Sequence, residues 1–201
     1  CDSVVCAFDM DRDCLMTNEE RRAFLEDKVD YLIEIPFTRE MMEMEAEKFI
    51  DEILYKKLHA SHIVVGTDFN FGHEKRGNHQ MLEKYAAKYG YTVDVVEKAY
   101  YKDREISSTY IRELLLDGNV PLANELLGYP YEITSVVEHG QQLGRTLGFP
   151  TMNLAPQEKK ILPKYGVYAC RVLVDGVWYG GVGNAGVKPT VAQEKRRLFE
   201  V

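Results

Sequence analysis

The first 128 residues alternate short apolar runs with segments whose apolar residues recur every three or four positions. Apolar runs of this length are typical of buried strands, and the three-to-four spacing is typical of amphipathic helices. Such alternation predicts an α/β fold with a mainly parallel sheet. We expect strands at residues 3–8, 31–35, 62–66 and 91–96, and helices from about Asn18 and over 46–58, 81–90, 109–116 and 121–127.

Local signals support several of these boundaries. Thr17 and Glu20 form a capping-box pattern, which predicts that a helix starts near Asn18. Pro36 stops the second strand, and Gly90 stands where a helix would end in the C-cap position. The first half therefore has defined helix and strand ends as well as a matching apolar pattern.

The pattern changes after Gly128, where short extended runs with frequent glycines replace the helical segments. The charge changes at the same place, because residues 1–128 carry a net charge of −10 and residues 129–201 one of +3. We therefore expect two domains, 1–128 and 129–201. The extended runs of the second domain predict an antiparallel sheet or a small β-barrel, and they lie at 131–138, 166–174, 178–183 and 197–201.

Composition narrows the functional class. With 201 residues, of which 45% are hydrophobic and 28% charged, the chain can bury a core without disulfides or structural metals. The net charge of −7 argues against sequence-independent binding to nucleic acid. We find neither an apolar run of about 20 residues, which a membrane span needs, nor a signal-peptide pattern. The four cysteines have no CxxC spacing, so we expect free thiols, a reducing cytoplasm and no zinc site.

A first candidate site is the loop that leaves the third expected strand, Gly66-Thr67-Asp68-Phe69-Asn70-Phe71-Gly72. In open α/β sheets, ligands bind beyond the carboxyl ends of the strands. Gly66 and Gly72 allow tight turns and close ligand approach, Asp68 offers a carboxylate, and Phe69 and Phe71 offer flat apolar faces. A turn that carries two core aromatics explains the same residues, and the spacing alone leaves both interpretations open.

A second candidate is the segment Ile106-Ser107-Ser108-Thr109-Tyr110-Ile111-Arg112, which leads from a loop into a helix. Ser107 and Ser108 stand where side chains cap free backbone N–H groups, and the same helix end attracts phosphate. Arg112, one turn into the helix, could add a charge-assisted contact to an anion. A plain N-cap explains the serines equally well.

The third candidate runs from Glu138 to Asn153 and contains three glycines spaced four residues apart. Gly140, Gly144 and Gly148 give the backbone the freedom to surround phosphates with N–H groups. Thr151 and Asn153 lie two residues apart, so in an extended segment their oxygens point to the same side and suit Mg²⁺. Flexible glycine turns capped by the threonine and the asparagine are the alternative.

These three segments, in this order, resemble the motifs of the bacterial bifunctional riboflavin kinase/FAD synthetase family. Residues 144–153, Gly-Arg-Thr-Leu-Gly-Phe-Pro-Thr-Met-Asn, resemble its riboflavin kinase signature. Residues 66–72 and 106–112 resemble motifs of its flavin adenylyltransferase module. Phe8-Asp9 and Ile35-Pro36-Phe37 extend the resemblance over nearly the whole chain.

The resemblance implies a Rossmann-like nucleotidyltransferase with a parallel sheet in residues 1–128 and a small antiparallel β-barrel kinase in residues 129–201. The kinase module would phosphorylate riboflavin to FMN, and the adenylyltransferase would join AMP from ATP to FMN with release of pyrophosphate. ATP and Mg²⁺ would serve both reactions, with riboflavin and FMN as acceptors and with no nucleic acid or membrane as partner. The oligomeric state, including a homo-oligomer, stays open.

The resemblance also implies roles for particular residues. Glu200 would be the catalytic general base that activates the ribityl hydroxyl for attack on the γ-phosphate. Residues 184–190 resemble a further loop of the kinase module. The kinase nucleotide site would comprise Gly140, Gly144, Arg145, Gly148, Thr151 and Asn153, with Thr151 and Asn153 as the metal ligands. The adenylyltransferase site would comprise Gly66, Asp68, Phe69, Phe71, Gly72, Ser107, Ser108 and Arg112.

The sequence departs from the family pattern at both ends. The family's HxGH motif, whose histidines stabilise the triphosphate, does not occur in these 201 residues, and the loop after Phe8-Asp9 is short. Val201 ends inside an expected barrel strand. We therefore expect both modules to be incomplete, the first at its N-terminus and the second at its C-terminus. An enzyme with kinase activity alone and a non-catalytic flavin- or nucleotide-binding module remain alternatives.

Overall fold

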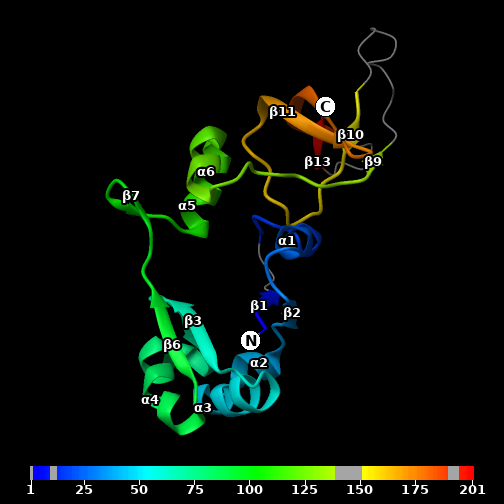
Figure 1. Ribbon diagram of the computed structural model, residues 1–201. Coiled ribbons are helices and arrows are strands. Elements are labelled where there is room, and N and C mark those ends of the chain that lie inside the picture. Colours follow the sequence, from blue (N-terminus) through cyan, green and yellow to red (C-terminus); the bar gives the residue numbers. More distant parts are fainter. Residues whose placement is uncertain (1, 10–12, 139–150, 190–194) are drawn as a thin grey trace. The chain divides into compact units, whose positions relative to one another are not determined.

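The computed structural model describes residues 2–9, 13–138, 151–189 and 195–201 (Figure 1). These residues form a mixed α/β structure with parallel strand pairs and one five-stranded antiparallel sheet. The contacts divide the chain into two compact units. The first consists of Cys1–Asp11 and Val29–Glu105, and the second of Arg12–Lys28 and Ile106–Val201. Helix α1 (Asn18–Leu25) therefore belongs to the unit that contains the C-terminal strands, although it comes early in the sequence.

The first unit contains two pairs of parallel strands. β1 (Val4–Asp9) pairs with β2 (Tyr31–Pro36), and β3 (His62–Gly66) pairs with β6 (Thr92–Val96). These four strands confirm the expectation from the apolar runs. Among the described residues the two pairs form separate ladders instead of one continuous sheet. In the second pair Gly66 lies opposite Val96, so the loops after β3 and β6 leave the same edge.

The helices of the first unit bury an apolar stripe that the sequence predicts. α2 spans Arg39–Glu43 and α3 spans Ala46–Lys48, which continues as a π-helix, η1, over Phe49–Lys57. The expected helix over 46–58 is therefore present, but it widens to π-helical geometry after its first turn. α4 (His79–Tyr89) ends at Gly90 with a φ of 75°, which confirms the expected C-cap. The core comprises Ala46, Phe49, Ile50, Ile53, Ile63, Phe71, Leu82 and Tyr91.

Short elements shape the loops that follow β3 and β6. β4 (Asn70–Phe71) pairs with β5 (Gly77–Asn78) around a single 3₁₀ turn, η2 (His73–Lys75), and β7 (Tyr100–Tyr101) pairs with β8 (Arg104–Glu105). Gly72 has a φ of +73°, and a Cβ atom there would lie 2.6 Å from the Cα of Ala46. Only glycine fits this close approach. The loop after β3 is thereby fixed against the helix that begins at Ala46.

The second unit contains three helices, of which α5 and α6 enclose a small apolar core. α1 begins at the predicted capping box, in which the Glu20 N–H donates to Thr17 Oγ1 over 3.1 Å and the Thr17 N–H to Glu20 Oε2 over 2.9 Å. α5 (Ser108–Asp117) and α6 (Val120–Leu127) confirm the two helices expected before residue 128. The core of this unit contains Ile111, Leu114, Leu115, Ala123 and Ile161.

The five-stranded sheet of the second unit confirms the expected antiparallel pairing. Its strands lie in the order β11-β12-β13-β10-β9. Of the extended run expected at 131–138, only the last two residues form a strand. The segment at 184–190 was expected as a loop, but it belongs to a strand as far as Pro189 because it pairs with the C-terminal strand. The strands span Val137–Glu138 (β9), Asn153–Leu154 (β10), Gly166–Val174 (β11), Val177–Pro189 (β12) and Lys195–Glu200 (β13).

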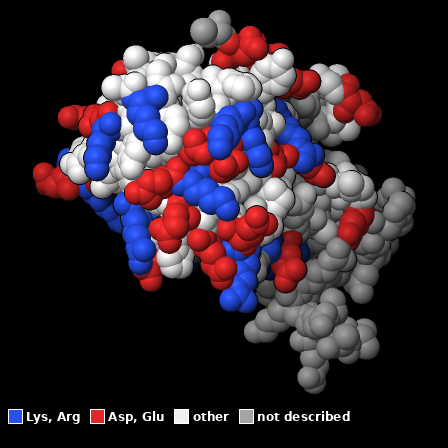
Figure 2. Space-filling view, turned by 90° about the horizontal axis from the view of Figure 1, so that it is seen from below, with Lys and Arg blue, Asp and Glu red and all other residues white. Residues whose placement is uncertain are grey.

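Charged side chains of both signs share the surface. Figure 2 shows acidic and basic residues interspersed on the face that it presents. Ion pairs within the helices of the first unit follow the same pattern, as in Arg39–Glu43 at 2.7 Å and Lys56–Asp51 at 2.6 Å.

Within the described ranges, no helix has both the length and the apolar character that crossing a membrane requires.

Candidate functional site

The antiparallel sheet aligns four polar residues in one row across neighbouring strands. Asn184 of β12 lies opposite Glu200 of β13, Glu200 lies opposite Asn153 of β10, and Asn153 lies opposite Glu138 of β9. Directly opposed residues of antiparallel strands project from the same face of a sheet. The row therefore gathers two amides and two carboxylates on one face.

Thr151 joins this row from the segment before β10. Its Oγ1 donates a hydrogen bond of 2.6 Å to Oε1 of Glu200. Reciprocal backbone hydrogen bonds between Met152 and Val201, at 2.7 and 3.0 Å, continue the ladder and fix the register. Asn153 is buried, with 9% of its surface exposed. The structure thus brings Thr151, Asn153 and Glu200 together, as the spacing of the first two and the resemblance led us to expect.

On the opposite face, the residues next to this row are apolar. Phe199, next to Glu200, is buried together with Ala185 of β12. Gly183 makes room for the phenylalanine, since a Cβ atom there would lie 2.5 Å from its Cε1. A strand with alternating faces therefore presents Glu200 on the polar side while Phe199 anchors it on the other.

The oxygen atoms of this row suit a magnesium ion that is shared with a nucleotide. A hydroxyl, an amide carbonyl and a carboxylate are hard donors, and Mg²⁺ is commonly bound by one or two protein carboxylates together with substrate phosphates. In the described part of the chain, no three His, Cys, Asp or Glu side chains gather into a metal site of their own. The expected nucleotide-loop residues Gly140, Gly144, Arg145 and Gly148 lie outside the described residues.

In the first unit, an ion-pair triad forms where β3 and β6 end. Lys98 Nζ lies 2.6 Å from Asp68 Oδ2 and 2.7 Å from Glu105 Oε1. The lysine hydrogen bond lowers the pKa of the Asp68 carboxyl, and the two carboxylates raise the pKa of Lys98. The Asp68 side chain remains 67% exposed, so its charge is available to a ligand.

The aromatic residues of this loop divide between core and surface. Phe71 is buried in the core and packs against Phe49, with ring centroids 5.3 Å apart. Phe69 stacks on Phe71 at 5.6 Å and is only partly buried. Gly66 lies close to the triad, because a Cβ atom there would be 3.1 Å from Asp68 Oδ1. The interpretation as a core aromatic therefore describes Phe71, whereas Phe69 and Asp68 offer groups outside the core.

The serine segment forms the start of α5 in the second unit. Ser107 is the N-cap, and its Oγ accepts a hydrogen bond from the Tyr110 N–H over 3.3 Å. Ser108 is the first residue of the helix. Arg112 Nε donates to the backbone carbonyl of Asp13 over 3.3 Å. The N-cap expected for this segment is therefore present at Ser107.

Comparison with known proteins identifies the family. The sequence model described as FAD synthetase matches residues 3–110, and the one described as riboflavin kinase matches residues 127–201. The chain belongs to the riboflavin kinase/FAD synthetase family. It is 39% identical over 181 residues to the bifunctional riboflavin kinase/FMN adenylyltransferase of Escherichia coli K12 and 36% identical over 173 residues to that of Listeria monocytogenes. These alignments cover 90% and 86% of this chain but 58% and 54% of the relatives, so the chain spans little more than half of their length.

A solved structure resembles the chain in fold as well. The crystal structure of a protein from Streptococcus pneumoniae, named as a macrolide-efflux protein, superposes with a TM-score of 0.84 at 29% sequence identity. The match covers 98% of this chain and 67% of that one. The described elements of this riboflavin kinase/FAD synthetase family member therefore recur in a protein of known structure.

Several residues to which the sequence assigned no role of their own join these groups in the structure. Asn184 and Glu138 join the polar row through strand register, which the sequence alone does not fix. Lys98 and Glu105 complete the triad with Asp68. A signal for Lys98 existed, because it closely follows the fourth expected strand, at the edge where a site was expected.

Proposed function

We propose that the protein containing this chain makes FMN from riboflavin and ATP, and then FAD from FMN and ATP. Residues 129–201 would be the kinase domain, built as a small β-barrel, and residues 1–128 a Rossmann-like adenylyltransferase domain. The family matches at 127–201 and 3–110 support this division. The three free thiols among the described cysteines, Cys6, Cys14 and Cys170, are compatible with a cytoplasmic enzyme.

The observation that carries the kinase proposal is the hydrogen bond between Thr151 and Glu200, with Asn153 directly opposite the same glutamate. Glu200 is the general base of this proposal. Its carboxylate takes the proton of the ribityl hydroxyl as the hydroxyl oxygen attacks the γ-phosphorus of ATP and ADP leaves. Thr151 occupies only part of its acceptor capacity, since a carboxylate offers about four lone-pair positions.

Thr151 and Asn153 would hold the magnesium ion together with ATP. When bound, the ion neutralises negative charge on the phosphates. Asn153 is buried on a strand that lies between two others, which restricts its side chain, and the bond to Glu200 orients the hydroxyl of Thr151. Such fixed polar groups need little reorganisation when charge moves during the reaction.

For the adenylyltransferase, we propose that a phosphate oxygen of FMN attacks the α-phosphorus of ATP, so that AMP is transferred and pyrophosphate leaves. Gly66, Asp68, Phe69, Phe71 and Gly72 would form the loop of that site. Ser107, Ser108 and Arg112 would contribute a helix N-terminus and a guanidinium, both of which favour phosphate.

The test is incubation of the full-length protein with riboflavin and Mg²⁺–ATP, and in parallel with FMN and Mg²⁺–ATP, followed by chromatographic separation of riboflavin, FMN and FAD. We expect FMN and FAD in the first reaction and FAD in the second. FMN without FAD would restrict the function to the kinase. Retention of both flavins without turnover would identify a binding module instead.

A further inference from the structure

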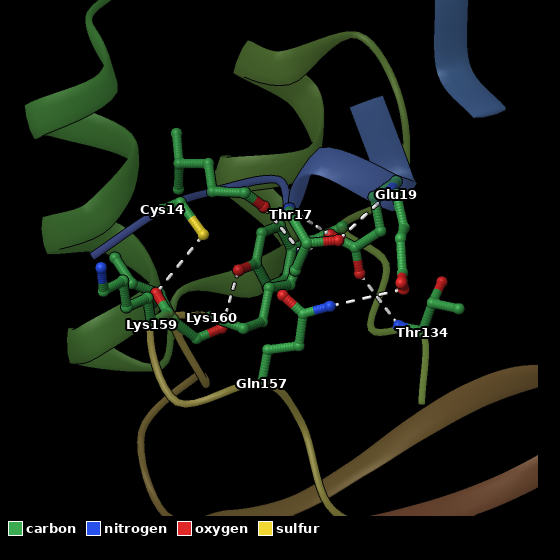
Figure 3. Close-up of polar contacts among 11 residues, drawn as sticks. Cys14, Thr17, Glu19, Thr134, Gln157, Lys159 and Lys160 are labelled. Carbon is green, nitrogen blue, oxygen red and sulfur yellow. Dashed lines mark hydrogen bonds and ion pairs between the residues drawn. The ribbon is translucent and has the colours of Figure 1, made fainter. Parts of the chain in front are cut away.

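Figure 3 shows a second polar cluster, which belongs to the second unit and is centred on a buried ion pair. The side chains of Lys160 and Glu20 are only 2% and 6% exposed, and Lys160 Nζ lies 2.6 Å from Glu20 Oε2. The same ammonium group donates to the backbone carbonyl of Leu15 over 2.7 Å and lies 4.3 Å from the ring centroid of Tyr131. Two hydrogen-bond acceptors and the face of an aromatic ring therefore surround the buried ammonium group.

The carboxylate of Glu20 connects further segments. Besides Lys160 it accepts the Thr17 N–H on Oε2 and the Thr134 N–H on Oε1, both at 2.9 Å (Figure 3). Cys14 extends these links, because its N–H donates to the carbonyl of Lys159 over 2.8 Å. One ion pair thus ties together the start of α1, the segment before β9 and the segment between β10 and β11.

The cluster reaches the strand that carries Glu200 through Arg197. The Arg197 guanidinium donates to the carbonyl of Lys160 over 2.9 Å and to that of Gln157 over 3.4 Å. Arg197 and Glu200 are three residues apart on β13, so their side chains leave opposite faces of the strand. The buried pair therefore fixes a segment that holds the back of β13 at Arg197, three residues along the strand from Glu200.

Net stabilisation is a poor reason for such a pair, because the cost of desolvating two charges can exceed their attraction. Directed hydrogen bonds, in contrast, hold a segment in one place, whereas hydrophobic contacts are non-directional. The many partners of Glu20 and Lys160 fit a role in which geometry matters more than stability.

We propose that the Glu20–Lys160 pair is a positioning device that, through Arg197, sets the position of Glu200 for phosphoryl transfer to riboflavin. This inference rests on the proposed kinase function. It makes kinase geometry depend on α1, although Glu20 lies in the part of the chain that matches FAD synthetase and Lys160 in the part that matches riboflavin kinase.

The test uses three variants of the full-length protein, studied at a temperature where circular dichroism shows each to be folded. Glu20→Leu combined with Lys160→Met replaces the pair by apolar side chains and keeps the interior filled, Arg197→Met cuts the link to β13, and the third variant combines all three changes. Lys56→Met, which removes an exposed ion-paired lysine of the first unit, is the matched control. Steady-state FMN formation gives kcat and KM, and hydrogen exchange reports on the amides of β13.

The pair replacement and Arg197→Met should each lower kcat for FMN formation on the order of tenfold, since small misplacement of a reacting group is costly, while KM for riboflavin stays within about twofold. The triple variant should be no slower than the slower of the two, because both changes interrupt one connection. Lys56→Met should match the wild type. An unchanged kcat in the folded variants, or additive losses, would overturn the positioning role.

Hydrogen exchange separates this inference from the kinase proposal. Faster exchange of the β13 amides in the pair replacement and in Arg197→Met, but not in Lys56→Met, supports the positioning of the strand even if no variant or wild type forms FMN. If neither the wild type nor any variant forms FMN, the proposed kinase function is wrong, and the Glu20–Lys160 pair then has no role in phosphoryl transfer. Unchanged exchange at β13 overturns the positioning itself.

Discussion

Two lysines, one in each unit, pair with carboxylates in very different surroundings. Lys98 lies between Asp68 and Glu105 and its side chain is 23% exposed, whereas Lys160 meets Glu20 in an interior where it is 2% exposed. The Nζ–O distance to an aspartate or glutamate is 2.6 Å in both. Similar contact geometry therefore occurs in two different dielectric environments.

The pKa shifts of the two lysines have opposite signs. Hydrogen bonds to two carboxylates raise the pKa of Lys98, and burial lowers the pKa of Lys160 in spite of its bond to Glu20. Desolvation disfavours the charged form of a lysine, and a neighbouring carboxylate favours it. The comparison shows that burial, and not the presence of a partner, decides the direction here.

The difference also separates two uses of charge. The exposed triad can exchange a protein contact for a ligand contact at small cost, because water already screens its charges. The buried pair has no such freedom, since loss of either partner leaves the other charge without compensation. The Lys98 triad near the loop after β3 is therefore suited to bind a ligand. The Glu20–Lys160 pair is suited to hold chain segments in place.

The largest effect should come from Glu200→Gln, which tests whether the polar row of the second unit acts independently of the loop in the first. Without a base, FMN formation should fall by about 10²–10⁴-fold. Riboflavin binding, followed by flavin fluorescence, should remain, and FAD formation from supplied FMN should continue. Chromatographic rates measure both reactions. Retained kinase turnover would remove Glu200 as the base.

The next effect concerns stability and compares the two lysines directly. Lys160→Met leaves the Glu20 carboxylate buried and unpaired, so the free energy of unfolding should fall by about 3–5 kcal/mol. Lys98→Met removes the partly buried partner of two exposed carboxylates and should lower it much less, because water screens those carboxylates. Urea denaturation followed by circular dichroism measures both. Equal losses would contradict the distinction between buried and exposed pairs.

The sequence predicts local features of the chain better than its long-range contacts. The capping box at Thr17 and Glu20, the C-cap at Gly90 and the main strands follow from neighbouring residues, and all are present. Lys160 instead follows Glu158 and Lys159 in what resembles an ordinary solvated charge run. Its burial depends on Glu20, 140 positions earlier, which no local pattern reveals.

The candidate sites follow the same rule. The two-residue spacing of Thr151 and Asn153 predicts that their oxygens share one side, because the reason is the pleat of a single strand. Glu200 lies 49 positions after Thr151, and only the resemblance to the family associated the two. The register that adds Asn184 to the row is set by hydrogen bonds between strands, which the sequence does not specify.

A smaller effect is expected for Arg112→Ala at the start of α5. Loss of a charge-assisted hydrogen bond to phosphate is worth about 1.5–3 kcal/mol, so FAD formation from FMN should slow by roughly 10- to 150-fold. FMN formation from riboflavin should change little, and Arg112→Lys should recover part of the loss. Equal impairment of both reactions would indicate a folding defect instead of a role in adenylyl transfer.

The smallest effect tests the exposed side of the comparison by titration. The folded-state pKa of Asp68 lies below 3.8 because Lys98 donates a hydrogen bond to its carboxylate. The stability that this bond contributes is therefore present above pH 3.8 and is lost as the pH falls through the lowered pKa.

In Lys98→Met the pKa of Asp68 should rise toward 3.8, which carboxyl ¹³C shifts measured against pH would report. Asp30, whose pKa is lowered by hydrogen bonds from Ser3, is an internal control and should keep its value. An unchanged Asp68 pKa would mean that solvent already screens the triad, and the contrast with the buried pair would then be greater than the structure implies.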